Sequence, residues 1–249
     1  MKPNRSFSFL SFISIVIFFT FNSSCTDPED NPDGSSVGTV KDIDGNQYKT
    51  IKIGTQVWMT ENLKTTRYND GTDIPNVISN TQWSNLTTGA YCNYDNLESN
   101  ATKYGRLYNW HAVSTGKLAP AGWHVPTDVE WTILENYLIA NGHNYDGTKV
   151  ENKIAKSLAS TTDWQLSSTK GTPGIYPEGN NSTGFSALPA GYRNYVGTFS
   201  NIGNYGLWWS SIEDGSSLAW YRHLTSNNVA LGRLNGNEGY GFSVWCIRD

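Results

Sequence analysis

The sequence predicts an α+β fold in which two main helices pack on short, mostly antiparallel strands that are connected by long loops. Three observations lead to this prediction. Residues 127–142 combine helix-capping signals with the apolar spacing of an amphipathic helix, and residues 148–159 repeat that spacing. The remaining segments are short, β-prone and separated by turns rich in Gly and Asn. After the N-terminal segment about 200 residues remain, which suits a single domain.

The first 24 residues have the pattern of an export signal. Lys2 and Arg5 precede an apolar run at residues 9–21, which is too short to span a bilayer comfortably. Cys25 then stands where a bacterial lipoprotein signal places its lipidated residue. We therefore expect lipidation of Cys25, with simple secretion as the alternative. The lipid would be the only membrane contact and would anchor the protein at the outer membrane.

A flexible acidic tether is expected between this anchor and the domain. Residues 25–38 are rich in Asp, Pro, Ser and Gly and show no apolar periodicity. Acidic residues directly after the cysteine also resemble the surface-export signal of Bacteroidetes-type lipoproteins, which implies a position on the cell surface. The domain itself is expected to span residues 39–249.

The charge of the chain argues against two classes of partner. The formal net charge is −4, and the export signal contains two of the positive charges, Lys2 and Arg5. No cluster of Lys or Arg occurs in the rest of the chain. We therefore expect no binding to nucleic acid and no electrostatic binding to an anionic membrane surface.

The domain is expected to begin with a β-hairpin. Residues 40–53 contain two β-prone segments on either side of an Asp-Gly-Asn turn. Asp42, Asp44 and Asn46 could instead belong to a calcium loop, but the spacing of an EF-hand is not continued downstream. We favour the turn.

Short elements follow in order along the chain. We expect a strand at residues 54–63, a turn at 68–74, a short helix around Trp83, a strand at 89–94, and a strand or short helix at 105–113. Five C-terminal strands are expected at residues 184–193, 207–211, 218–224, 229–234 and 241–247. The segment before these five strands, residues 164–183, is expected to be a long exposed loop, and such loops are often functional.

The two helices of the prediction lie in the middle of the chain. Thr127 is a good N-cap, and Glu130 completes a capping box. The expected buried face of this first helix comprises Trp131, Leu134 and Leu138, widened by Ile133 and Tyr137. The second helix is expected at residues 148–159, where Val150, Ile154 and Leu158 recur at helical spacing.

Two cysteines remain once Cys25 is set aside. Cys92 and Cys246 are a single pair in an exported chain, and export exposes a chain to oxidising conditions. We therefore expect a disulfide between Cys92 and Cys246, with a pair of reactive or metal-binding thiols as the alternative.

Six motifs resemble one known family, in order and across residues 40–249. They are DIDGNQYKTIKIGTQVWMTENLK, YGRLYNWHAV, GWHVPTDVEW, GFSALPAGYR, WWSS and GFSVWC. These motifs resemble the Fibrobacter succinogenes major paralogous domain, which is common in lipoproteins and secreted proteins of Bacteroidetes and Fibrobacteres. The resemblance implies a C-type-lectin-like fold.

A more distant resemblance concerns chemistry. HVPTDVEW and GFSVWC are similar to segments of formylglycine-generating (sulfatase-modifying factor) enzymes, which bind copper through a close cysteine pair. Here Cys246 has only Cys92 as a partner, and Ser243 replaces the arginine of the terminal segment. The chain therefore departs from the pattern that oxidase chemistry requires.

No catalytic or metal-binding motif is recognised. The four histidines lack the spacing of zinc ligands, and no Walker A loop, Rossmann fingerprint or GxSxG elbow occurs. Glu213 and Asp214 could form a hydrolytic carboxylate pair, but two adjacent acids in a turn are usually solvated. We expect no catalytic residue, metal or cofactor. Calcium dependence is not implied either, because the EPN, QPD and WND motifs of calcium-dependent lectins are absent.

Aromatic side chains in the C-terminal half are the best signal for a ligand site. Alternation along strands should bury half of them and leave the others as flat apolar surfaces that stack on sugars or anchor a peptide. The candidate ligand-binding residues are Tyr176, Tyr192, Arg193, Tyr195, Tyr205 and Arg222. We expect a non-catalytic binding module for an extracellular glycan or, second, a protein. The alternatives are a sulfatase-modifying-factor-like oxidase, a cryptic hydrolase and a structural subunit of a surface assembly.

Overall fold

The computed structural model describes Met1 and residues 36–249. Apart from Met1, the predicted export signal, the lipidation site at Cys25 and the tether up to residue 35 lie outside the described residues. Residues 36–38, which the sequence analysis assigns to the tether, form the start of the first strand, β1 (Ser36–Lys41), and pair with β2 (Gln47–Ile53). The tether prediction is therefore wrong at its C-terminal end.

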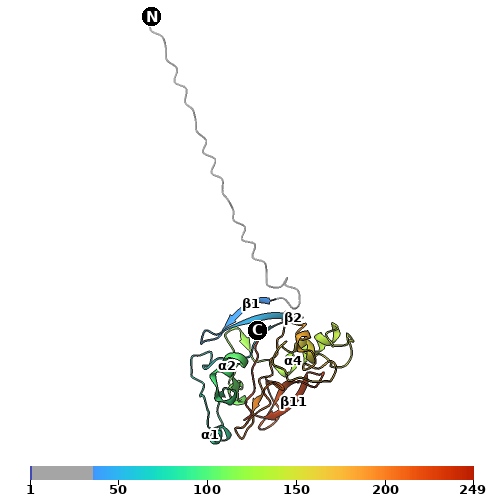
Figure 1. The fold of residues 1–249 in the computed structure, drawn as a ribbon. Helices are drawn as coiled ribbons and strands as arrows, with labels where there is room; N and C mark the ends of the chain where they lie inside the picture. The colour runs from blue at the N-terminus through green and yellow to red at the C-terminus, as the bar shows by residue number, and fades with distance from the viewer. Residues whose placement is uncertain (2–35) are drawn as a thin grey trace. The chain divides into compact units, whose positions relative to one another are not determined.

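The described strands form four sheets, and all hydrogen-bonded neighbours among these strands are antiparallel. Strands β1 and β2 lie side by side (Figure 1). The largest sheet has the order β1-β2-β3-β12-β6, where β3 is Gln56–Met59, β12 is Ile247–Arg248 and β6 is Trp123–His124. The second has the order β11-β10-β9, comprising Gly232–Asn237, Leu218–Thr225 and Tyr205–Glu213. Two small sheets pair β4 (Tyr91–Cys92) with β5 (Leu107–Tyr108), and β7 (Tyr192–Arg193) with β8 (Phe199–Ser200).

Helices make up the rest of the described regular structure. They are α1 (Asn80–Ser84), α2 (Glu98–Tyr104), α3 (Trp110–Val113), α4 (Asp128–Ala140) and α5 (Ala155–Leu158), with 3-10 turns at Tyr94–Asn96 and Pro177–Gly179. The α+β class is confirmed. The expectation of two main helices is wrong, because only α4 among the described helices is longer than seven residues. No helix in this part of the chain is both long and apolar enough to cross a membrane.

Helix α4 forms where its capping signals predict. The backbone N–H of Glu130 donates to Thr127 Oγ1 at 3.2 Å, and the N–H of Thr127 donates to Glu130 Oε2 at 2.7 Å, so the capping box is complete. Trp131, Leu134 and Leu138 are fully buried as expected, but Ile133 is 45% exposed. The buried stripe is therefore narrower than predicted.

The second predicted helix is wrong over most of its length. Only α5 is helical, and Val150 is 63% exposed, whereas Ile154 and Leu158 are buried. The cause is Asn144, whose Nδ2 donates to the carbonyls of residues 148, 150 and 151 and whose Oδ1 accepts from the N–H of Lys153. These side-chain bonds use backbone groups that a helix would pair internally, so the segment becomes a loop.

The predicted disulfide is also wrong, because Cys92 and Cys246 are both free and fully buried. The two thiols belong to different parts of the core: Cys92 packs with Trp83 and Leu107, and Cys246 packs in the cluster of Tyr48. Burial raises the pKa of Cys92 to about 12, which the nearby Arg193 only partly opposes, and burial also raises the pKa of Cys246. Both thiols are therefore protonated and unreactive at neutral pH.

The stability of the domain is expected to depend on pH through His124. Its Nδ1 lies 2.7 Å from Asp249 Oδ1 and its Nε2 lies 2.8 Å from Glu130 Oε1. Burial would lower the pKa of His124, but the hydrogen bonds to Asp249 and Glu130 outweigh burial and raise it above the ordinary value of 6.5. The stabilisation is then fully present below the unfolded-state pKa and is lost as the pH rises through the higher folded-state pKa.

This dependence can be measured by thermal unfolding of the wild type and of His124→Gln from about pH 5 to about pH 9. The difference in Tm between the two proteins should be largest at the acid end and should shrink as the pH rises. A difference that stays constant over this range would contradict the prediction.

Candidate functional site

An aromatic groove lies beside the sheet β11-β10-β9. We call it the tyrosine groove; its volume is about 330 Å³, and it is lined by Tyr192, Tyr195, Tyr205, Leu207, Tyr221, Asn235, Gly236, Asn237, Tyr240 and Phe242. These residues come from β7 and the turn after it, from all three strands of the sheet, and from the segment that follows β11. Residues distant in the sequence therefore meet at one surface.

Strand register decides which side chains line the groove. Tyr221 on β10 is paired with Trp209 on β9, and the next residue, Arg222, is paired with Trp208. Because side chains alternate along a strand, Tyr221 and Arg222 lie on opposite faces of the sheet. Tyr221 lies in the groove, whereas Arg222 points to α4.

The floor of the groove is a connected set of rings. Phe242 is buried and lies 4.3 Å from Trp209 of the core, measured between ring centroids, and 4.8 Å from Tyr221. Tyr240 stacks on Phe242 at 5.3 Å, and Tyr192 packs edge-on against Phe242 at 6.1 Å. This packing holds the tyrosine rings in place before any ligand binds.

The tyrosine hydroxyls provide the polar groups of the groove. Burial, with smaller contributions from the nearby Tyr240, Tyr192 and Tyr205, raises the pKa of Tyr221 to about 12. The Tyr221 phenol is therefore neutral at physiological pH and, like any neutral phenol, can donate and accept hydrogen bonds. Within the described residues, the hydroxyls of Tyr205, Tyr221 and Tyr240 make no hydrogen bond, so they are available to a ligand.

The structure brings together three of the six predicted ligand residues. Tyr192, Tyr195 and Tyr205 all line the tyrosine groove. Tyr176 is 72% exposed and does not line the groove; it lies in the loop before the 3-10 turn Pro177–Gly179, where its carbonyl accepts a bond from Lys156. Tyr176 therefore belongs to a different surface.

The assignment of Arg193 and Arg222 as ligand residues is contradicted by the structure, since both are fully buried. Arg193 donates to backbone carbonyls around α1. Arg222 forms an ion pair with Asp128 at the start of α4 and donates to Thr132 Oγ1 at 2.9 Å. Burial would raise the pKa of Asp128, but the guanidinium groups of Arg233 and Arg222 outweigh burial and lower it. Both buried arginines bind the protein itself and are not available to a ligand.

Four further residues that line the groove were not among the predicted ligand residues: Tyr221, Tyr240, Asn235 and Asn237. Alternation could have identified Tyr221, because in each of the pairs Tyr192-Arg193 and Tyr221-Arg222 only one member can face the groove. No local pattern marks Tyr240 or the two asparagines, whose positions depend on how the chain after β10 folds back on the sheet. Of the two candidate acids, Glu213 is the last residue of β9, and Asp214 follows that strand and accepts a bond from Asn235 Nδ2 at 2.5 Å.

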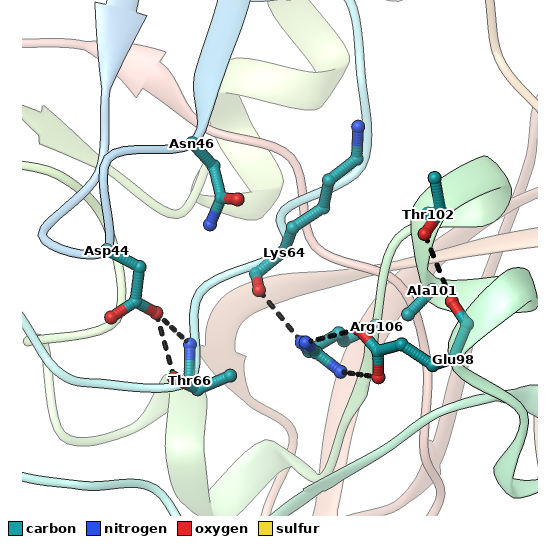
Figure 2. Close-up of a pocket in the computed structure, with 8 residues that line it drawn as sticks. All are labelled: Asp44, Asn46, Lys64, Thr66, Glu98, Ala101, Thr102 and Arg106. Carbon is teal, nitrogen blue, oxygen red and sulfur yellow. Dashed lines mark hydrogen bonds and ion pairs between the residues drawn. The ribbon is translucent and has the colours of Figure 1, made fainter.

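A second hollow, of about 340 Å³, lies between the β1–β2 turn and α2 and is lined mainly by polar and charged residues (Figure 2). Its charged groups are used within the protein. Asp44 accepts from the N–H of Thr66 at 2.5 Å and from Arg67 Nε at 2.6 Å, and these bonds outweigh burial and lower the pKa of Asp44. Arg106 donates to Glu98 at 3.0 Å and to the carbonyl of Lys64 at 2.8 Å. This hollow is therefore a structural junction, and the tyrosine groove is the better candidate site.

The fold and the groove together define a small α+β domain that displays a pre-arranged aromatic surface. The chain belongs to the Fibrobacter succinogenes major domain family, whose sequence model matches residues 51–248. Comparisons with curated proteins and with solved structures gave no match.

Proposed function

We propose that this protein is a non-catalytic binding module whose tyrosine groove takes an extracellular glycan. The observation that supports this most directly is the combination of fixed tyrosine rings with unpaired hydroxyls in one groove. Rings of this kind stack on the apolar faces of sugars, while phenols and amides such as Asn237 pair with sugar hydroxyls. The lining has no charged side chain, which favours a neutral ligand over an ionic one.

The domain is proposed to have a C-type-lectin-like fold. Support comes from the family membership and from the mixed α+β arrangement with one long helix against antiparallel strands. An experimental structure tests this proposal: failure to superpose on C-type lectin domains over both main sheets would refute it.

The protein is further proposed to be lipid-anchored through Cys25 at the outer membrane and to face the cell exterior. The support is the export signal and the acidic segment that follows it. Cys25→Ala should move the protein from the membrane fraction to the soluble fraction of the producing cells. Retention of this variant in the membrane fraction would remove the support for the anchor.

Glycan binding is expected to depend on tyrosines of the groove. The domain from residue 36 onward should give saturable binding on a broad glycan array, with and without calcium. Tyr195→Ala and Tyr205→Ala should each weaken the binding about tenfold, because each removes a stacking surface worth about 1 kcal/mol or slightly more. Tyr195 is half exposed, so its loss should leave the fold intact.

Tyr176→Ala is the matched control, because Tyr176 is an exposed tyrosine outside the groove. It should bind as the wild type does. An array without any hit would refute the glycan proposal and point to a protein ligand or to a structural role, and equal binding by all three variants would place the site elsewhere.

The oxidase alternative has less support. Copper binding would need both thiols on one ion, whereas Cys92 and Cys246 belong to different core clusters and are fully buried. Among the described residues, no group of three or more His, Cys, Asp or Glu is placed to hold a metal ion. Copper bound at one equivalent by the purified protein, and lost in Cys246→Ala, would reverse this judgement.

A further inference from the structure

A second chamber adjoins the tyrosine groove. We call it the Glu238 chamber; its volume is about 310 Å³, and it is lined by Trp83, Ser84, Leu86, Thr87, His111, Tyr195, Ser217, Asn237, Glu238 and Gly239. Tyr195 and Asn237 line both hollows. The two hollows are therefore neighbours that share one wall, and each is at the small end of the range of ligand sites, about 300–1,000 Å³.

The shared wall is held in place by the backbone. The N–H of Gly239 donates to Asn237 Oδ1 at 2.9 Å, so the amide group of Asn237 has a defined direction. Its Nδ2 makes no hydrogen bond within the part of the chain that the structure describes. Tyr195 packs edge-on against Tyr240 with ring centroids 5.5 Å apart, and half of its surface is exposed. A ligand that crosses from one hollow to the other would contact both residues.

The two hollows differ in chemistry. The tyrosine groove has rings and neutral hydroxyls, whereas the Glu238 chamber contains a carboxylate with His111 Nδ1 3.6 Å from Glu238 Oε2. The backbone positions Glu238 from both sides: its N–H donates to the carbonyl of Ser217 at 3.2 Å, and its carbonyl accepts from the N–H of Trp110 at 2.9 Å. The two oxygens of a carboxylate can accept two hydrogen bonds, which matches neighbouring hydroxyls on a sugar ring.

We propose that the ligand is a neutral oligosaccharide of at least two sugar units, one on the rings of the tyrosine groove and the next beyond Tyr195 and Asn237, with its hydroxyls on Glu238. This inference rests on the proposed glycan-binding function and extends it to chain length and charge. An acidic sugar is disfavoured because its carboxylate would lie beside Glu238 in a chain of net charge −4.

Calorimetric titration with neutral oligosaccharides of increasing length tests the proposal. The probes are β-1,4-linked gluco-, manno- and xylo-oligosaccharides and α-1,4-linked gluco-oligosaccharides, each from one to six units. In the series that binds, the affinity should rise about tenfold or more from the monosaccharide to the disaccharide or trisaccharide and then level off. The reason is that the Glu238 chamber adds contacts to the second sugar unit and none to units beyond it.

A variant that fills the Glu238 chamber tests whether this chamber binds the second sugar unit. Ser84 is an exposed residue of α1 that lines it, so Ser84→Trp should fill the chamber and abolish the gain with length while leaving monosaccharide affinity unchanged. Gln82→Trp is the matched control, because Gln82 is an exposed residue of the same helix that lines neither hollow. Glu238→Gln should reduce the gain in affinity with length, because it removes the carboxylate that accepts hydrogen bonds from the second sugar unit.

The outcomes separate the two proposals. Binding that depends on Tyr205 but is independent of length and of Ser84→Trp would overturn the two-chamber inference and leave the glycan-binding function standing. No binding in any of the four series, together with an array without hits, would overturn both. Tighter binding of uronic-acid oligosaccharides than of neutral ones would contradict the assignment of charge.

Discussion

Replacing Arg193 by methionine is expected to lower the free energy of unfolding by more than about 3 kcal/mol. The side chain is fully buried and donates to the carbonyls of Gly197 (2.9 Å), Val77 (2.6 Å) and Ile78 (2.9 Å). A further bond to Asn80 Oδ1 at 2.9 Å and stacking of the guanidinium 4.6 Å from the centroid of Trp83 complete its surroundings. Methionine fills a similar volume but removes all of these bonds, and of the three carbonyls only that of Ile78 keeps another donor among the described residues, Asn96 Nδ2 at 3.3 Å.

Urea unfolding measures this effect, and two further variants sharpen it. Arg193→Lys should retain part of the stability, because an ammonium group cannot donate to all these acceptors at once. Arg248→Met, at an exposed position, should change the free energy by no more than about 0.5 kcal/mol. If Arg193→Met and the wild type unfold at the same midpoint concentration of urea, the buried guanidinium does not stabilise the contact between α1 and β7.

Replacing Asn62 by leucine is expected to cost about 3 kcal/mol of stability. Asn62 is 3% exposed, and its Oδ1 accepts from Trp208 Nε1 at 2.8 Å and from Trp245 Nε1 at 2.5 Å. Its Nδ2 donates to the carbonyl of Tyr104 at 2.7 Å, at the end of α2. One amide therefore satisfies two buried indoles and a helix terminus, and leucine would leave all three polar groups unpaired.

The matched control is Asn85→Leu, because Asn85 is exposed and makes a single bond from Nδ2, to the carbonyl of Thr81 at 2.8 Å. Urea unfolding followed by tryptophan fluorescence should give a much larger loss for Asn62→Leu than for Asn85→Leu. Similar losses for the two variants would mean that the indole bonds add nothing to the stability.

Local elements were predictable where the sequence has its own stop and start signals. The capping box of Thr127 and Glu130 marks α4 correctly, because both partners of its hydrogen bonds lie within four residues. The first hairpin turn is correct for the same reason: the side chain of Asp42 accepts from the N–H of Asp44 and of Asn46. The helix that was wrongly predicted at residues 148–159 shows the opposite case. There the side chain of Asn144, which precedes the predicted helix, bonds to backbone groups that the helix would have paired with one another.

The aromatic character of the candidate site could be predicted from the sequence, but the residues that form it could not. The aromatic side chains of the C-terminal half indicated an aromatic surface, and Tyr192, Tyr195 and Tyr205 do meet in one groove. Assigning Arg193 to the same surface was wrong, because it is adjacent to Tyr192 on one strand and must face the other way.

The sequence by itself determined the family, the α+β class, the capped helix and the aromatic character of the site, since these depend on motifs and on residues close together in the chain. Only the tertiary structure decided that Tyr221 and Tyr240 complete the groove, that Arg193 and Arg222 are buried, and that Cys92 and Cys246 lie in different parts of the core. The physical reason is that strand register and long-range packing set which face each side chain occupies, and neither is encoded within a short stretch of sequence.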